Sequence, residues 1–163
     1  METIIATEQS VFQIRNILMG DEIIRKLLYI QSPAALTSTD NVTSAMVTNL
    51  ITIVPYVTDI GGIENSSQSN FIVIYPSYID LSNDMQHMID ISIDMFVYKD
   101  HYILNSNKFR LNQLLDRVIF LLEDKKLSFA ERFTISSAKL TNIDNGKTIG
   151  FLTNWSIVNG TEK

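Results

Sequence analysis

The stretch Met88–Glu123 constrains the fold of this chain most strongly, because a strand pattern is followed there by a helix pattern. From Ile89 to Val97 every second residue is apolar, which is the period-2 pattern of a strand with one buried face. After a polar turn at Asp100–Asn107, five apolar residues share one helical face: Leu111, Leu114, Leu115, Val118 and Leu122. Neither segment can hide its apolar side alone, so we expect this long helix to pack on the buried face of the strand.

Two helices are predicted before this stretch. Thr7 can cap the first, which has an apolar side and ends at Gly20. Asp21 can cap a second, short helix over Asp21–Ile30, and Pro33 prevents it from continuing. The two are expected to form a helical hairpin or one kinked helix.

The segment Ser32–Thr58 fits two descriptions. Thr39–Asn41 can cap a helix that runs through Met46, whereas Leu50–Val54 has the pattern of a short buried strand, and both can occur in succession. Polar, glycine-containing residues without periodicity follow, so we expect a mobile loop at Asp59–Asn70.

Further strands are expected on both sides of the long helix. The apolar run Phe71–Tyr75, stopped by Pro76, should pair with the strand at Ile89–Tyr98 across the long connection Ser77–His87.

A hairpin is predicted after the long helix. Its strands are Arg132–Leu140 and Thr148–Val158, and the Asn-Gly pair in Asp144–Gly146 tolerates the positive φ angles of a tight turn. Trp155 lies on the apolar parity of the second strand and is expected to be a packing residue.

Together the elements predict one α+β domain over residues 1–163. We expect a mainly antiparallel sheet of about four strands packed against one long helix, with the N-terminal helices at a face or an edge. Phe96 and Tyr98 point away from the apolar parity of their strand. This indicates that the second face of the sheet is also partly covered, by the N-terminal helices or by another subunit.

The composition excludes several classes of protein. The chain has 163 residues, 45% of them hydrophobic, and no cysteine, so disulfides, thiol catalysis and cysteine-ligated zinc are excluded. No secretory signal or membrane-spanning run is recognisable, so we expect a soluble, unexported protein. A net charge of −5 argues against tight nucleic-acid binding, and it suits either ordinary solubility or a conduit through which DNA slides. Basic residues are scattered among Asp116, Glu123 and Asp124 and are expected to form a mixed charged helix surface: Lys108, Arg110, Arg117, Lys125, Lys126 and Arg132.

Only one cluster resembles a chemical site: Asp84, His87, Asp90 and Asp94, with His101 further along the chain. Asp90 and Asp94 share a strand face but stand about 13 Å apart at a rise of roughly 3.3 Å per residue, so they cannot hold one ion by themselves. Solvent-facing carboxylates and solvated loop histidines are the simpler interpretation. We therefore predict no catalytic, cofactor-binding or metal-binding residues and no enzymatic activity.

The order of elements in the C-terminal half resembles a known family. An Ile/Asp-rich strand (Asp90–Tyr98), a long helix that starts at an arginine (Arg110–Leu122) and a last strand with the sequence Gly150-Phe-Leu-Thr-Asn-Trp155 follow an amphipathic helical N-terminus. This order is similar to that of the tail terminator or tail-completion proteins of long-tailed bacteriophages.

The resemblance implies a structural virion protein of the tail or neck that is assembled in the host cytoplasm and does not associate with a membrane. Members of the family are small α+β subunits that form a ring, usually a hexamer, which caps the tail tube, ends its polymerisation and joins it to the head connector. The implied partners are further copies of the chain, the tail tube protein and a neck or connector protein, while double-stranded DNA passes through the bore. Exposure arguments place seven residues at the assembly interface: Ile60, Gly61, Gly62, Ile63, Tyr78, Phe96 and Tyr98.

Other functions stay open. The segment Ser32–Asn70 is longer than the minimal fold of the family requires, which also fits a head-completion or connector-adaptor ring, or a ring at the end of a contractile sheath. Two different classes are a small metal-dependent hydrolase that uses Asp84, His87 and Asp90, and an adaptor of a cellular complex.

Overall fold

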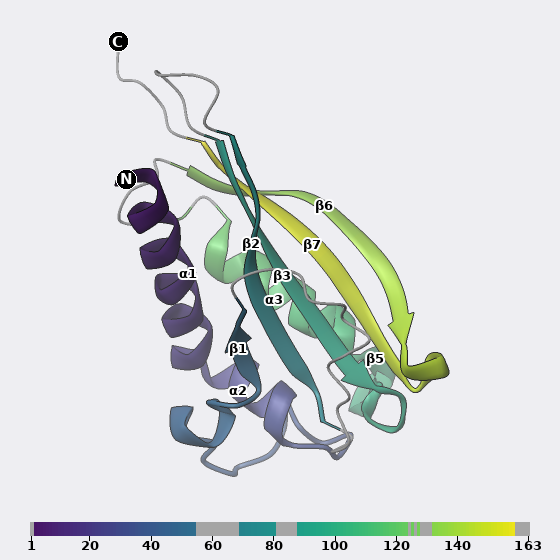
Figure 1. Cartoon of the computed structure of the whole chain (residues 1–163). Helices are drawn as coiled ribbons and strands as arrows, with labels where there is room; N and C mark the ends of the chain where they lie inside the picture. The colour runs from purple at the N-terminus through teal and green to yellow at the C-terminus, as the bar shows by residue number, and fades with distance from the viewer. Residues whose placement is uncertain are drawn as a thin grey trace.

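The structure is a computed structural model that describes residues 2–54, 69–80, 88–123, 125, 127 and 132–158. It has the predicted α+β class, with helices packed on a sheet (Figure 1). The helices are α1 (Glu2–Gly20), α2 (Glu22–Tyr29) and α3 (Arg110–Leu122). The strands are β1 (Ile51–Ile53), β2 (Phe71–Asp80), β3 (Met88–Tyr98), β4 (Ile103–Leu104), β5 (Lys108–Phe109), β6 (Arg132–Ile143) and β7 (Thr148–Val158).

The main sheet has five strands in the order β1-β2-β3-β7-β6. Four of them, β2, β3, β7 and β6, pair antiparallel as predicted, whereas β1 adds a fifth strand that runs parallel to β2. The sheet is therefore mixed. Because β3 and β6 each pair antiparallel with β7, they run in the same direction and are joined by α3 as a crossover helix.

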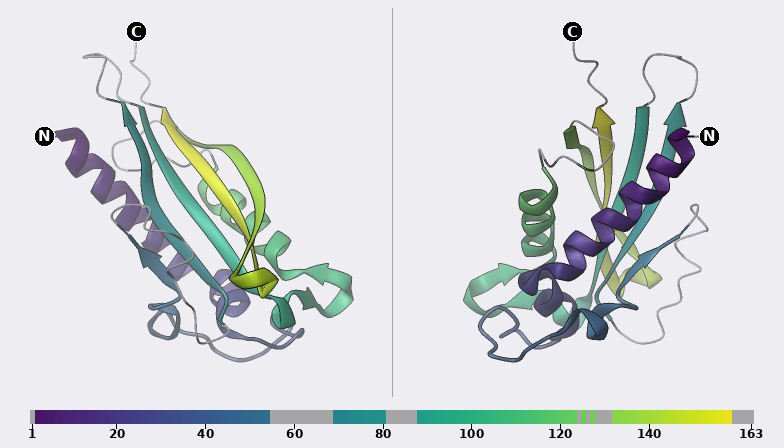
Figure 2. Two further views of the ribbon diagram at one scale, coloured as in Figure 1. Left: turned by 45° about the vertical axis from the view of Figure 1, so that its right-hand side comes forward. Right: turned by 90° about the vertical axis from the view of Figure 1, so that its left-hand side faces the viewer.

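The helices lie on one face of the sheet (Figure 2). The apolar side of α3 is buried as predicted, since Leu111, Leu114, Val118 and Leu122 have no exposed surface. They share the core with alternate residues of β3, including Ile91 and Ile93, and with Trp155 of β7. The expectation of one long helix with further N-terminal helices is matched in part, because α3 has 13 residues whereas the N-terminal α1 is longer, with 19.

Local differences from the prediction occur where the pattern was ambiguous. Helix α1 begins at Glu2 and not at a Thr7 cap. The helix expected after Thr39–Asn41 is absent from the described segment, which instead holds a single 3-10 turn at Ser44–Val47 before β1. Asp21 does cap α2, because its Oδ1 accepts a hydrogen bond from the Ile24 N–H at 2.9 Å.

Strand β2 does not stop at Pro76 but continues to Asp80, so Ser77 belongs to the strand and not to a connection. The Ile72 N–H donates to the Leu50 carbonyl, and the Ile74 carbonyl accepts from the Val54 N–H. The backbone polar groups of alternate residues of β2 therefore point towards β1. Pro76 continues this alternation, and its missing N–H falls on the edge of the sheet beyond the end of β1. The register with β3 shifts just after it, between Pro76 and Tyr78.

The face of the sheet without helices carries a second, small apolar cluster. Phe96, which we expected on an exposed outer face, is fully buried there, so that expectation is wrong. Its ring stacks on Phe71 of β2 with the centroids 4.8 Å apart, and it lies across Gly150 of β7. Alternation identified the face correctly, but it does not predict how much the cross-strand neighbours cover a side chain.

We expect Gly150→Ala to lower the free energy of unfolding by about 1–3 kcal/mol or more, because a Cβ there overpacks the cluster. The added atom would stand 2.4 Å from Phe96 Cδ1 and 2.7 Å from the Met95 carbonyl oxygen. Gly20→Ala is the matched control, since nothing lies within 4 Å of its added Cβ. Urea unfolding of both variants tests this, and equal stabilities would contradict the packing of Phe96 over Gly150.

Candidate functional site

The residues predicted at an assembly interface do not form one surface. Tyr78 is 54% exposed on β2, at the edge of the sheet. Phe96 is buried, as described above, and Tyr98 is half-buried. Ile60, Gly61, Gly62 and Ile63 lie outside the described residues. Tyr78 is thus the member of this set that the structure places on the surface.

Tyr98 takes part in internal packing. Its N–H donates to Asn70 Oδ1 at 3.2 Å, and its ring centroid lies 5.5 Å from that of His101. Asn70, expected to end the mobile loop, is fully buried and donates to the carbonyls of Leu27 and Leu28 at 3.3 and 3.4 Å. His101, expected to be solvated, is 9% exposed, with Nδ1 3.3 Å from Asn70 Oδ1. Burial, together with the nearby Arg110 charge, lowers the pKa of His101 and keeps it neutral near pH 7.

Arg110 is fully buried and does not belong to a charged helix surface as predicted. Its guanidinium donates only to backbone carbonyls: Nε to His101 (2.7 Å), Nη1 to Leu27 (2.6 Å) and Ile30 (2.7 Å), and Nη2 to Gln31 (3.2 Å) and Ser32 (2.8 Å). Burial lowers the pKa of Arg110 to about 10, so it stays charged at neutral pH. A signal was present in the sequence, because Arg110 stands at helical spacing with Leu114 and Val118 on the apolar side of α3.

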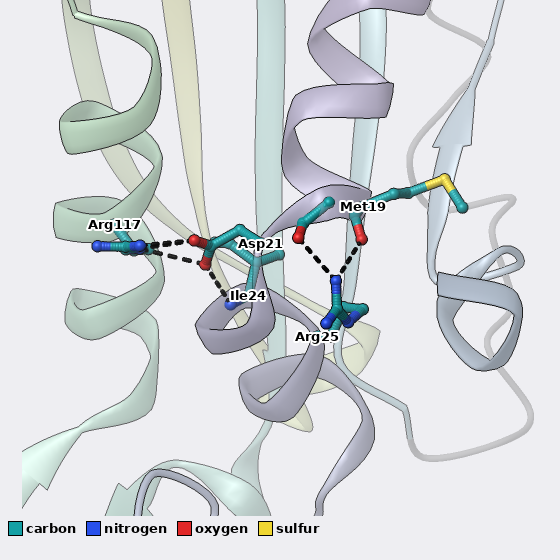
Figure 3. A network of polar contacts seen from close by, with 6 residues as sticks. Met19, Asp21, Ile24, Arg25 and Arg117 are labelled. Atoms are coloured by element: carbon teal, nitrogen blue, oxygen red, sulfur yellow. Dashed lines mark hydrogen bonds and ion pairs between the residues drawn. The ribbon is translucent and has the colours of Figure 1, made fainter. Parts of the chain in front are cut away.

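Three other arginines also make internal contacts. Figure 3 shows Arg25 Nη1 donating to the carbonyls that end α1, those of Met19 (3.0 Å) and Gly20 (2.7 Å). In the same view Arg117 of α3 pairs with Asp21, Nη2 to Oδ2 at 2.6 Å. Burial alone would raise the pKa of Asp21, but the hydrogen bonds from Arg117 and Ile24 outweigh it and hold the pKa below its usual value.

Arg15 of α1 closes the outer edge of β1. Its Nε donates to the Ile51 carbonyl at 2.8 Å and its Nη2 to the Thr48 carbonyl at 3.0 Å. Four arginines are therefore committed to the fold, and none of these four is left to form a stripe that binds phosphates.

A polar network crosses the face without helices. Asp94, expected to face solvent, is only 1% exposed. Its Oδ2 accepts from the Tyr75 hydroxyl at 2.7 Å and its Oδ1 from the Thr153 N–H at 3.0 Å. Trp155 Nε1 then donates to Thr153 Oγ1 at 2.9 Å, which extends the network through β7 to the helix side. Among the described residues, the partners of the Asp94 carboxyl are neutral donors and not a cation.

Burial raises the pKa of Asp94, although the hydrogen bonds from Tyr75 and Thr153 oppose this. Burial also raises the pKa of Tyr75 to about 12, assisted by its bond to Asp94. Tyr75 therefore remains a neutral donor across the physiological range.

The residues considered for metal binding are not brought together. Half-buried Asp90 accepts from Ser156 Oγ at 2.7 Å, and Asp94 is occupied by Tyr75 and Thr153. Asp84 and His87 lie outside the described residues. Within the described part of the chain no three His, Asp or Glu side chains converge as metal ligands would.

Two open hollows occur near the N-terminal helices. One of about 570 Å³ is lined by residues that include Tyr29, Met46 and Leu50, and one of about 420 Å³ includes Phe12, Arg15 and Ile51. No described Asp, Glu or His lines either hollow.

Comparison with known proteins adds no relative. A scan against protein-family models gives no match, and a search of curated proteins finds no similar sequence. Among the described residues no helix is both long and apolar enough to cross a membrane.

We expect Arg110→Met to lower the free energy of unfolding by ~3 kcal/mol or more, because five buried or partly buried carbonyls lose their donors. Lys108→Met, at an exposed position two residues away, is the matched control and should change stability little. Urea unfolding followed by circular dichroism measures both. A loss for Arg110→Met no larger than that of the control would show that the buried guanidinium does not stabilise the fold.

Asp94→Asn should change how stability depends on pH. A carboxyl whose pKa is raised by folding stabilises most below its unfolded pKa of about 3.9, and this contribution is lost as pH rises through the folded pKa. The free energy of unfolding of the wild type should therefore fall relative to that of Asp94→Asn between pH 4 and pH 8. Asp116→Asn, on the exposed side of α3, controls for the loss of a surface carboxylate. If the free energy of unfolding of the wild type instead increased relative to that of Asp94→Asn as pH rises, the raised pKa of Asp94 would be contradicted.

Proposed function

We propose that this chain is a structural protein of a long-tailed phage that forms a ring, of six copies, on the end of the tail tube. The support is the order of elements: two N-terminal helices, the Ile/Asp-rich β3, α3 beginning at Arg110, and the β6–β7 hairpin with Gly150 and Trp155 in its last strand. In this role one face of the ring fits the last ring of tube protein and ends polymerisation. The other face meets the neck or connector protein.

The use of the polar side chains supports a role in assembly rather than in catalysis. Asp94, Arg110 and Arg117, which are titratable groups in partly or fully buried places, each make hydrogen bonds within the fold. The described surface instead offers large apolar groups, with Phe12 58% exposed on α1 and Phe120 70% exposed on α3. Exposed aromatic side chains are typical of surfaces that contact other proteins.

The proposed ring works through the shape of its two faces and not through a chemical reaction. It is assembled in the host cytoplasm and becomes part of the virion. The net charge of −5 suits a bore through which DNA slides without being held. A metal-dependent hydrolase has less support, because Asp90 and Asp94 are bound by Ser156 and Tyr75.

Tail length after deletion of the gene tests this function. We expect overlong, headless tubes by electron microscopy of lysates, because nothing stops the addition of tube protein. A plasmid copy of the wild-type gene is the control and should restore tails of normal length.

Tails of normal length separated from filled heads would contradict termination and assign the protein to the neck, as a head-completion or adaptor ring. Normal particles from the deletion would overturn the structural role altogether.

A further inference from the structure

The main sheet has two strand edges that no described strand covers. Strand β6 pairs with β7 on one side only, and its residues from Ser136 to Leu140 are all exposed. Strand β2 is covered by β1 at Ile72–Ile74, so its second half, Pro76–Asp80, has no described neighbour on that side. Unpaired edges of this kind are ready to pair with another strand.

We propose that these two edges pair with each other between copies of the chain, β6 of one copy with the second half of β2 of the next. The proposal rests on the ring proposed above and identifies the contact that builds it. Two different patches on one chain make a head-to-tail interface, and such an interface closes into a ring when the rotation between copies closes. The main chain supplies the hydrogen bonds, as in other cases of strand addition.

The strand directions fit. Successive antiparallel pairs from β2 through β3 and β7 to β6 leave β2 and β6 pointing in opposite directions. Copies related by rotation about an axis to which the strands are tilted by about 40° keep these directions. The contact between β6 and the next β2 is therefore antiparallel, like the neighbouring pairs in the sheet.

The charges in the sequence also fit. The free part of β6 has Lys139 and no carboxylate, whereas β2 has no basic residue and one acidic residue, Asp80. A twofold pairing of β6 with itself would instead bring two copies of Lys139 together across the contact, which is unfavourable. Charge therefore favours β2 of the next copy over a second β6.

The offset between the two edges matches a closed ring. Within one copy, Tyr78 of β2 pairs with Asp90 of β3, Asp90 with Ser156 of β7, and Ser156 with Thr134 of β6, so Tyr78 and Thr134 stand at the same level of the sheet. Lys139, in the middle of the free part of β6, lies five residues further along, since 139 − 134 = 5. Pairing Lys139 with Tyr78 sets Ser137–Thr141 against Pro76–Asp80, and β6 has to leave the edge after Thr141, where β1 covers β2. This register shifts each copy by about 17 Å along the strands, over a width of four strands or about 19 Å. This corresponds to a strand tilt of about 40°, within the 35–45° of closed barrels.

The hand of the offset decides which face lines the bore. In Figure 1 the sheet is seen from its face without helices, with α3 behind it and β2 to β6 running from left to right. The next copy, beside β6, is shifted towards the start of β2. Strands in closed barrels have one hand of tilt, because strands twist in a right-handed sense. A ring with this direction of shift has that hand only when the helices lie on its outside.

The face that carries Asp90, Ser92 and Asn154 then lines the bore. Six copies, each adding four strands, give a backbone diameter of about 50 Å, which is wide enough for a DNA duplex. The helices, with exposed Phe12 and Phe120, face outwards.

Cysteine crosslinking tests the contact in a chain that has no cysteine of its own. We expect Tyr78→Cys combined with Lys139→Cys to give, with a short bifunctional thiol reagent, a ladder of linked copies that ends at the closed ring. The single variants should give no linked copies, because each contact then holds one thiol. Tyr78→Cys combined with Asp116→Cys, which is exposed on α3, is the matched control and should give no ladder.

Linked dimers from Lys139→Cys alone would overturn the proposal in favour of a twofold β6–β6 contact. A double variant that remains unlinked, whether the chain is monomeric or forms rings, would overturn it as well. The outcome does not depend on the deletion experiment. A ladder from a protein whose deletion leaves tails normal would support the contact and refute termination, whereas overlong tails without a ladder would do the reverse.

A charge variant provides a second test. Lys139→Glu should weaken association measured by sedimentation about fivefold for each contact, while Lys139→Arg should leave it unchanged. Equal association of the two variants would contradict pairing of this strand with the acidic β2.

Discussion

The buried guanidinium of Arg110 is the interaction on which the arrangement of the layers depends. It joins the start of α3 to the carbonyls after α2, about eighty residues earlier in the chain, and to the turn that follows β3. The last carbonyls of a helix have no partners within it, and burying them without donors is costly. A planar group with five N–H donors can satisfy the five carbonyls at once, whereas a lysine has only three donors. The charge remains buried without a carboxylate, and the partial negative charge at the end of α2 balances part of it.

Other polar contacts extend this anchoring through the helical layer. Asn70 binds the last turn of α2 from the start of β2, and Asp21 joins the start of α2 to Arg117 of α3. Together they hold α2 at both ends, between α1 and α3 (Figures 1 and 3). A helix of 8 residues is too short to be stable by itself, so its place is set by these side chains and by burial of Ile24 and Leu27. Arg110 and Arg117, like Arg15 and Arg25, are thus used within the fold, and the strand edges and exposed apolar groups remain as surfaces for association.

The elements that were predicted from the sequence are those with a strong local pattern. Strand β3, the apolar side of α3 and the β6–β7 hairpin follow from periodicity and from the Asn-Gly turn, in which Asn145 has a φ of 54°. Arg110, Asp94 and Phe96 were misjudged for one physical reason. Alternation or helical spacing shows which way a side chain points, but its burial depends on partners distant in the chain, such as Leu27 for Arg110 and Thr153 for Asp94. Strand β1 was ambiguous because three residues carry too little periodicity, and its pairing with β2 is decided by tertiary contacts.

The two free edges carry features that limit which strand can add to them. Pro76 removes one donor from the edge of β2, so a strand that requires a full ladder there is rejected. On β6, Glu123 Oε2 accepts from the Ile135 N–H at 3.2 Å, which occupies the edge at that point, and Lys139 repels a second copy of the same strand. What remains open is Ser137–Thr141 of β6 against Pro76–Asp80 of β2, because β1 occupies the edge of β2 further along. The same residues that discourage indiscriminate aggregation therefore restrict pairing to the staggered register, and this is the register that a closed ring with outward helices requires.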